Sequence, residues 1–500
     1  MPDSASQPEG RARNIVQGMG YLTAHFVANS GLGFIFLSAI IRLVPNFQYG
    51  IYSAVLVTVS IAATIGGMGL NLAATRFVAF YEGEASWDAA RKTLLLSLLI
   101  TGVTAALYLA ISPLLSLYFT KSTGWTWAFL LGGGWVLTAS VSNTLQGILQ
   151  GLKKYAQMAK ILFTTRLIMV GATIVAVYYI RSIEIPLVAW IAFYTAISIW
   201  IFLLMEKNLV RAKGDLKYST IMRYALPLGF ATIIAAFSLT SDSVIVGGYL
   251  NPSSLGIYQA AIQISTVLGV VSVTPLITAL FPEISSSKTP ADISNGVRLA
   301  FRFIAFAVLP LSLFVAAVPS QLLSLFTNGG VYLAGTLTLE LIALFYVFVA
   351  IQTILLNLLQ GVGKTFEVII IGVVAASTDI GVALLLVPRF GLAGAVTSRV
   401  AVALDATFVS IYLCRRYMDR LDGWSFFTKC AVASMIPAAL VFMLTTFIST
   451  SLVFLVPYAL LFSAIYLVCV RQLRLLSNED RTYLSHILPG RLRKIANFLL

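Results

Sequence analysis

The chain is dominated by apolar runs, each long enough to cross a lipid bilayer. A hydrocarbon core of about 30 Å needs about 20 apolar residues per helix, and the sequence contains about fourteen such runs. They cover residues 18–41, 52–75, 94–117, 126–149, 161–180, 187–205, 224–250, 257–281, 300–322, 337–359, 368–387, 392–413, 430–448 and 452–470. With 59% hydrophobic and 10% charged residues, the composition predicts an all-α polytopic membrane protein.

The polar connections predict how the chain is oriented. The leader at residues 1–17 runs into a first span that is too long for a signal-peptide core, so we expect an uncleaved anchor. The formal net charge of +14 comes from basic residues that gather in alternate short connections, which is the positive-inside pattern rather than a nucleic-acid surface. We therefore predict a multi-pass protein of the cell membrane with both termini in the cytoplasm and no nucleic-acid partner.

Short motifs recur in the two halves of the sequence and indicate a duplication. Gly50 and Gly256 lie in similar Gly-Ile-Tyr turns, and Gln150-Gly151 is repeated at Gln360-Gly361. Two six-helix lobes of the same topology would be related by a pseudo-two-fold axis along the membrane normal, with a cavity between them. The predicted parts are a leader (1–17), a first lobe (18–205), a cytoplasmic linker (206–223), a second lobe (224–413), two additional spans (414–470) and a basic tail (471–500).

The tail has apolar residues at helical spacing beside Arg491, Arg493 and Lys494. This pattern fits an amphipathic helix on the anionic inner surface, and it equally fits a solvated basic tail.

The sequence offers little for catalysis. Gly361 to Thr365 resembles the end of a phosphate-binding loop, but Leu358 stands where the first glycine would be needed. With two histidines and no paired cysteine spacing, no metal site is indicated, and the outer loops lack clustered acids. We therefore expect no enzyme activity, no cofactor, no metal and no disulfide among Cys414, Cys430 and Cys469.

Polar side chains inside the apolar runs are the candidate functional residues. An aspartate near the centre of a membrane helix costs roughly 2.5 to 3.5 kcal/mol, so such residues usually face a partner helix or a wet cavity. The candidates are His25, Arg42, Asn71, Arg166, Asp242, Gln259, Gln263, Glu340, Asp379, Arg399 and Asp405.

Each candidate also has a structural interpretation. Asp242 could be capped by Ser238 and other local hydroxyls, and Arg166 could belong to an ion pair between helices or lobes. Arg42, Glu340 and Arg399 could place long side chains at the membrane interface. His25 could be a hydrogen-bonded bundle residue instead of a proton relay. The amides of Asn71, Gln259 and Gln263 suit sugar hydroxyls and interhelical hydrogen bonds alike.

Three stretches resemble a known family. Ile41-Arg42-Leu43-Val44 followed by Tyr49 to Tyr52 is similar to the basic residue and Gly-aromatic turn after the first span of the polysaccharide-export flippases. Asp242 to Gly247 with Leu255 to Tyr258, and the Gln-Gly repeats, are similar to its seventh-span acid, next turn and lobe-internal repeats. These flippases belong to the multidrug/oligosaccharidyl-lipid/polysaccharide superfamily.

The resemblance implies alternating-access transport of a polyprenyl phosphate or diphosphate that carries an oligosaccharide. Arg166 and Arg399 would then bind the anionic group, and Asn71, Gln259 and Gln263 the sugars. Asp242, Asp379, Asp405, Arg42 and His25 would serve coupling or gating. Membrane lipids, a coupling Na⁺ or H⁺ and glycan polymerase or transferase machinery are the expected partners.

Three alternatives remain open. A cation-coupled multidrug extruder of the same superfamily would prefer an acidic and aromatic cavity. A peptidoglycan-precursor flippase would carry several arginines in its first two spans, where this chain has Arg42 and Arg76. A membrane enzyme of glycan assembly would need a large acidic outer loop.

Overall fold

The computed structural model describes residues 29–81, 83–211, 214–269, 273, 290–417, 424–447, 451–473 and 475. Within these ranges the regular elements are helices, with no strand, and eleven helices are long and apolar enough to cross a membrane. This confirms the predicted all-α polytopic membrane fold. The other three predicted runs also coincide, wholly or in part, with helices at Asn29–Leu43, Thr126–Gly151 and Pro252–Leu268.

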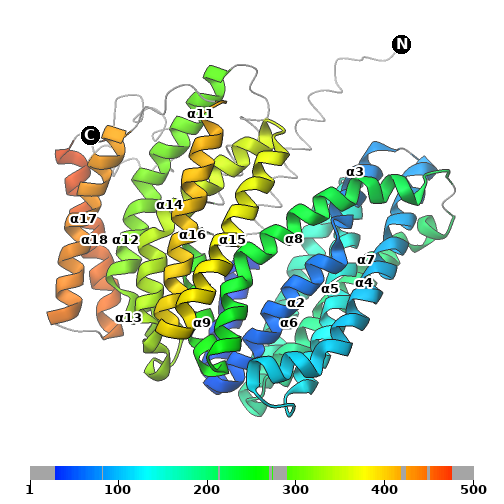
Figure 1. Ribbon diagram of the computed structural model, residues 1–500, viewed down its shortest axis with the longest axis horizontal. Helices are drawn as coiled ribbons and strands as arrows, with labels where there is room; N and C mark the ends of the chain where they lie inside the picture. Colours follow the sequence, from blue (N-terminus) through cyan, green and yellow to red (C-terminus); the bar gives the residue numbers. More distant parts are fainter. Residues whose placement is uncertain are drawn as a thin grey trace. The chain divides into compact units, whose positions relative to one another are not determined.

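The helices form two compact units that divide between Gln259 and Ala260. The first unit contains helix Asn29–Leu43, α2 (Asn46–Gly67), α3 (Leu70–Phe80), α4 (Gly83–Thr120), α5 (Thr126–Gly151), α6 (Tyr155–Ile180), α7 (Glu184–Arg211), α8 (Tyr218–Tyr249) and the first part of α9 (Pro252–Leu268), as labelled in Figure 1. The division falls later in the chain than the predicted linker, because α8 packs against α2, α3 and α4. The six-helix lobes remain a prediction.

The second unit contains the rest of α9, then α11 (Pro290–Phe303), a π-helical segment (Ile304–Val308), α12 (Leu309–Ala317), α13 (Pro319–Phe326), α14 (Thr336–Gly361), α15 (Thr365–Phe390), α16 (Leu392–Cys414), α17 (Trp424–Phe447) and α18 (Leu455–Gln472). Helices α15 and α16 form a closely packed hairpin, and α16 also packs on α14. The predicted additional spans correspond to α17 and α18. Tyr466 of α18 donates to the carbonyl of Phe306 at 2.6 Å, within the π-helical segment.

A glycine-rich break separates α2 from α3. Met68 and Gly69 both have positive φ, at 39° and 71°, a conformation that glycine adopts without a steric penalty. The break lies against α8: a β-carbon at Gly69 would be 2.6 Å from the carbonyl oxygen of Ala225, and one at Gly229 would be 2.8 Å from the carbonyl group of Met68. The two glycines therefore let the backbones of α3 and α8 cross in close contact.

The duplicated Gly-Ile-Tyr motifs, predicted as turns, lie in helices. Asn251 caps α9, because its Oδ1 accepts a 2.8 Å hydrogen bond from the backbone N–H of Ser254, and Pro252 follows as the first helical residue. Gly50 lies inside α2 and packs on this helix start, where a β-carbon would overlap the carbonyl group of Pro252. The two copies of the motif thus contact each other.

The other repeat forms the same helix end twice. After α5, the amides of Lys153 and Lys154 donate to the carbonyls of Gln150 and Leu149; after α14, Gly363 and Lys364 repeat the pattern. Lys153 and Gly363 both have positive φ, at 59° and 78°, as the residue after a helix commonly does. Local structure therefore supports the duplication that the sequence predicts.

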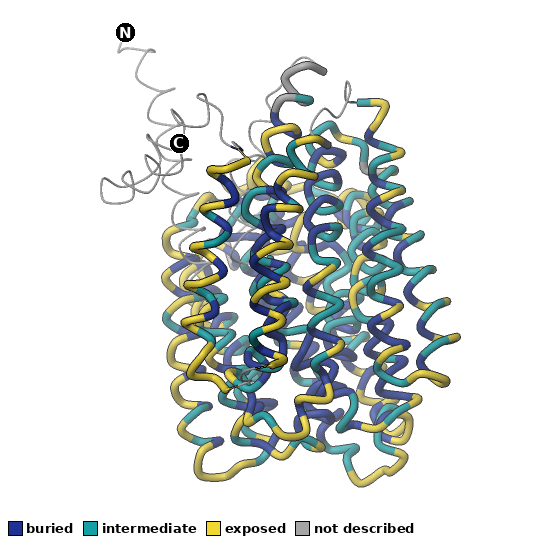
Figure 2. Tube along the Cα trace, turned by 90° about the vertical axis from the view of Figure 1, so that its left-hand side faces the viewer, coloured by how far each residue is buried: buried dark blue, intermediate teal, exposed yellow. Residues whose placement is uncertain are grey.

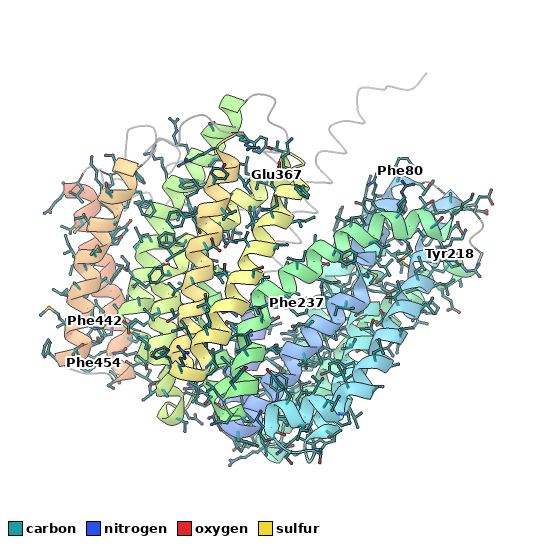
Figure 3. All side chains as sticks on the ribbon, viewed as in Figure 1. Phe80, Tyr218, Phe237, Glu367, Phe442 and Phe454 are labelled. Atoms are coloured by element: carbon teal, nitrogen blue, oxygen red, sulfur yellow. The ribbon has the colours of Figure 1, made fainter. Side chains whose placement is uncertain are left out.

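Buried and exposed positions alternate along the helices (Figure 2). Large aromatic side chains project from the outer surfaces, among them Phe80 in the first unit and Phe442 and Phe454 in the second (Figure 3). Exposed apolar surface of this extent is expected where lipid is the solvent. Cys414, Cys430 and Cys469 are buried free thiols.

Candidate functional site

Arg166 lies in α6 and is buried, with 7% of its surface exposed. Its guanidinium carbon lies 4.5 Å from the centre of the Trp190 ring, 5.5 Å from Phe193 and 5.6 Å from Phe36. Aromatic faces within about 6 Å attract a cation through the ring quadrupole. Helix Asn29–Leu43, α6 and α7 therefore place one arginine in an aromatic cage (Phe36, Trp190 and Phe193).

The cage is itself held in place. Trp190 stacks on Trp135 and on Tyr194, with ring centres 5.1 and 5.7 Å away. Its indole Nε1–H donates a 2.8 Å hydrogen bond to the hydroxyl of Tyr52 in α2. Helices α2, α5 and α7 thus fix the ring that faces the guanidinium, and preorganisation of this kind lowers the cost of ordering a site around a ligand.

Space beside the guanidinium depends on a glycine. A β-carbon at Gly33 would approach the Arg166 Nη2 atom to 3.2 Å. A larger residue at this position would crowd the guanidinium from the side of helix Asn29–Leu43.

Arg166 lacks a carboxylate partner in the part of the chain that the structure describes. Its buried Nε–H also has no hydrogen-bond acceptor there. The predicted interhelix ion pair is therefore not found among the described residues. A buried cation with an unfilled donor is costly, and a phosphate oxygen would satisfy that donor with a charge-assisted hydrogen bond.

Asp242 lies in a second buried polar cluster, between α8 and α9. It is fully buried, and its Oδ2 accepts a hydrogen bond from the Tyr258 hydroxyl. Its Oδ1 accepts a 3.0 Å bond from the Ser243 hydroxyl, which in turn accepts from Nε2 of Gln259 at 2.8 Å. The structure therefore brings two sequence candidates, Asp242 and Gln259, into one network.

The second unit has polar pairs across the α15–α16 hairpin. Asp379 is 2% exposed, and its Oδ1 accepts a 2.8 Å bond from the Ser398 hydroxyl. Asp405 is half-buried, and its Oδ2 accepts from Thr378 at 2.6 Å. Arg399 follows Ser398 on α16 and is also half-buried. Three candidates thus lie on one helical hairpin.

The remaining candidates lie outside these clusters. Asn71 and Arg42 are exposed at the ends of α3 and helix Asn29–Leu43, and Gln263 and Glu340 are half-buried. His25 lies outside the described residues.

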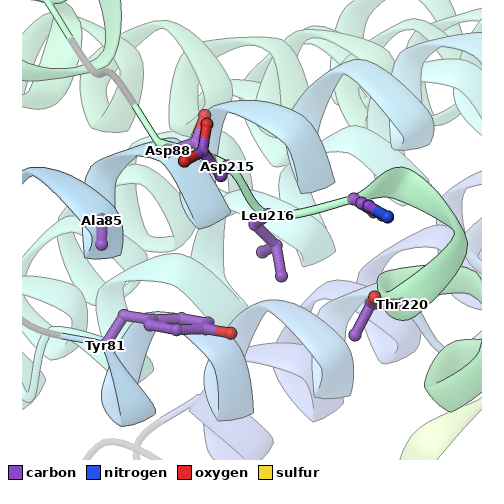
Figure 4. A pocket seen from close by; sticks show the side chains of 7 residues that line it. Tyr81, Ala85, Asp88, Asp215, Leu216 and Thr220 are labelled. Atoms are coloured by element: carbon purple, nitrogen blue, oxygen red, sulfur yellow. The ribbon is translucent and has the colours of Figure 1, made fainter.

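A pocket of about 390 Å³ lies elsewhere in the first unit, where the connection before α8 passes over α4 (Figure 4). Its lining residues are Tyr81, Ala85, Asp88, Asp215, Leu216, Lys217 and Thr220. None of these residues belongs to the aromatic cage.

Sequence reasoning found Arg166 but missed the cage. Trp190, Phe193 and Tyr194 recur at the i, i+3 and i+4 positions of the sixth apolar run. That spacing puts three aromatic rings on one helix face and could have identified them. Tyr52 and Phe36 gave no comparable signal, because their proximity depends on how the helices pack.

Residues 15–288 match the family model described as polysaccharide biosynthesis protein, which covers more than half of the chain. The chain belongs to the polysaccharide biosynthesis protein family. A second family model, MatE, matches residues 227–385 of this family member. These matches confirm the predicted membership of the multidrug/oligosaccharidyl-lipid/polysaccharide superfamily.

Two relatives of this polysaccharide biosynthesis protein are archaeal. An uncharacterised membrane protein of Methanocaldococcus jannaschii is 20% identical over 387 residues, which cover 71% of this chain and 75% of that protein. A probable flippase, AglR of Haloferax volcanii, is 29% identical over 181 residues, or 35% of this chain and 37% of that protein.

Solved structures share the fold. The lipid II flippase MurJ, in an inward closed conformation, gives a TM-score of 0.74 at 13% identity and covers 90% of this chain and 97% of MurJ. An inward-facing multidrug MATE transporter gives a TM-score of 0.58 at 17% identity, covering 84% and 94%. This member of the polysaccharide biosynthesis family therefore has the architecture of flippases and multidrug transporters.

Proposed function

We propose that this protein is a flippase that moves an oligosaccharide linked to polyprenyl phosphate or diphosphate from the inner to the outer leaflet. The caged, buried Arg166 carries the proposal. A lipid phosphate needs a cation to leave the headgroup layer, and a guanidinium presents a planar fork of donors that matches phosphate oxygens. The aromatic cage holds the charge in place without neutralising it.

The family supports this substrate class. Its description names polysaccharide biosynthesis, and a flippase is among the relatives. A transporter that presents a bound headgroup to each side in turn needs no covalent step, so we infer no enzyme activity for this chain. Surface polysaccharide or glycoprotein glycan assembly, in the cytoplasmic membrane, is the process that such a flippase would supply.

A multidrug extruder is the second candidate, favoured by the MatE match and by the fold of the multidrug transporter. The buried cation argues against it, because cationic drugs would be repelled by Arg166. A peptidoglycan-precursor flippase has the fold of MurJ in its favour and would also use a cationic site. The transport assay therefore has to compare substrates that differ in their glycan as well as substrates that differ in their charge.

The test is transport by purified protein in vesicles, with a fluorescent polyprenyl-diphosphate oligosaccharide in the inner leaflet and, in parallel, lipid II and a cationic dye. We expect Arg166→Ala to abolish translocation of the oligosaccharide lipid, while Arg166→Lys keeps part of it. Arg181→Ala is the matched control, since Arg181 is an exposed arginine at the end of the same helix. Full translocation by folded Arg166→Ala, or export of the dye alone, would reject the proposal.

A further inference from the structure

Helix α8 is held to the first unit at both of its ends, although the duplication assigns it to the second lobe. At the outer end, Lys121 follows α4. Its ammonium Nζ donates to the carbonyl of Gly248 in α8 at 2.7 Å and to that of Tyr118 in α4 at 3.0 Å. One lysine thus satisfies carbonyls in the last turns of two helices, where a positive charge also interacts favourably with each helix dipole.

The hydrogen bonds of Lys121 to Gly248 and Tyr118, called here the outer clip, have a specific geometry. Lys121 has a φ of 55°, a left-handed conformation that costs energy for a residue with a β-carbon and persists only where surrounding contacts impose it. Gly248 also packs directly on α4: a β-carbon there would overlap the ring of Tyr118. The clip therefore rests on backbone contact as well as on charge.

Lys92 forms a second clip, the inner clip, near the first residue of α8. Nζ of Lys92 in α4 pairs with Oδ2 of Asp88 at 2.8 Å and donates to the carbonyl of Gly214 at 2.9 Å. Gly214 belongs to the connection that leads into α8, which runs past Asp88 in Figure 4. Lys92 also lies 6.0 Å from the ring centre of Tyr218, the first residue of α8.

Between the two clips, α8 crosses the α2–α3 break at Gly69 and Gly229 with almost no space between the backbones. Beyond the outer clip, Tyr258 and Gln259 in the first half of α9 are bonded back to Asp242 and Ser243 of α8. Contacts with the earlier helices therefore recur along the chain from Gly214 to Pro252, which packs on Gly50 of α2.

We propose that α8 is a fixed part of the first unit throughout the transport cycle, held by the Lys92 and Lys121 clips. Movement of the two units then arises after Gln259, where they divide, and not in the connection at residues 206–223. The sequence repeat contains six spans, but the first moving unit would contain seven, because the seventh span moves together with the first six.

Distances between spin labels test the proposal without a transport assay, so the result does not depend on transport activity. Labels are placed at exposed positions of α4 (Leu99), α7 (Leu203) and α8 (Phe230), in protein whose three cysteines are replaced by alanine. We expect the Leu99–Phe230 distance distribution to be as narrow as the Leu99–Leu203 reference. It should also stay unchanged when a short-chain polyprenyl diphosphate is added in lipid nanodiscs.

The clips are tested by Lys92→Met with Lys121→Met, which should broaden the Leu99–Phe230 distribution and shift it to longer distances. Lys153→Met is the matched control, because Lys153 is an exposed lysine in the same left-handed conformation, at the end of α5. A Leu99–Phe230 distribution broader than the reference in the native protein would overturn the fixed position of α8. An unchanged distribution in the double variant would overturn the role of the lysines.

Discussion

The hydroxyl of Tyr258 donates a hydrogen bond to Oδ2 of Asp242, and this contact joins α9 to α8. Both residues are fully buried, so the carboxylate has exchanged water for a phenol and for the hydroxyl of Ser243. A carboxylate bound in this way can be a structural acceptor or a charge used in transport. The two roles respond differently to substitution.

Asp242→Asn should leave the protein folded and lower translocation, if the charge takes part in the transport cycle. The amide keeps the shape of the side chain and one acceptor oxygen. Asp242→Leu should also destabilise the protein by about 1–3 kcal/mol, because the Tyr258 and Ser243 hydroxyls would lose their acceptor. The measurement is vesicle translocation normalised to folded protein, together with thermal unfolding.

Asp215→Asn is the control for these variants, since Asp215 is an exposed aspartate in the connection before α8. Normal specific translocation by Asp242→Asn would leave Asp242 with a structural role alone. Asp379 and Asp405 would then be the coupling candidates.

Trp190→Leu should impair translocation more than it impairs folding. The substitution removes the ring nearest to Arg166 and leaves the guanidinium free to change rotamer, so binding of a phosphate-bearing lipid should weaken. Cation–π contacts of desolvated groups contribute about 2 kcal/mol, which corresponds to roughly a thirty-fold loss of affinity. Binding of a polyprenyl diphosphate, measured by calorimetry, tests this.

Trp200→Leu on the same helix is the matched control, because Trp200 is 37% exposed and lies outside the cage. Tyr52→Phe should reproduce part of the Trp190→Leu loss, since the indole N–H would lose its acceptor. Equal affinity for all three variants and the native protein would show that the cage does not position Arg166.

Gly50→Val should destabilise the first unit strongly, because the added side chain would overlap the carbonyl group of Pro252. Overpacking of a close contact typically costs about 1–3 kcal/mol, so the thermal midpoint should fall. Gly102→Val in α4 should be tolerated, since a β-carbon there would have no neighbour within 4 Å. Similar midpoints for the two variants would contradict the helix crossing.

A cysteine at Ser253 should react with a membrane-impermeant thiol reagent from outside the cell. This follows from the predicted cytoplasmic N-terminus, since Ser253 lies between the seventh and eighth apolar runs. A cysteine at Lys153, after the fourth run, should react from the cytoplasmic side alone. The reverse pattern would invert the predicted topology.

The sequence alone determined the class of fold and the family. A single apolar segment of bilayer length is expected to be a helix, because the polar groups of its backbone must form their hydrogen bonds within the span when lipid surrounds it. The repeated Gly-Ile-Tyr and Gln-Gly motifs also predicted a duplication, and their local structures match. The fold class depends on information within about 25 consecutive residues, and the duplication on motifs that recur in the two halves, so a single sequence contains both in full.

The tertiary structure decided which polar residues meet. Arg166 was visible in the sequence as a costly residue, but Phe36 reaches it from a helix more than a hundred residues earlier in the chain, so no local pattern could assemble the whole cage. Packing also determined to which unit α8 belongs. The duplication groups α8 with later helices, whereas the lysine clips and the Gly69–Gly229 crossing attach it to earlier ones. Such contacts depend on side chains brought together only when helices pack, and for that reason the compact units divide at Gln259 and not at the predicted linker.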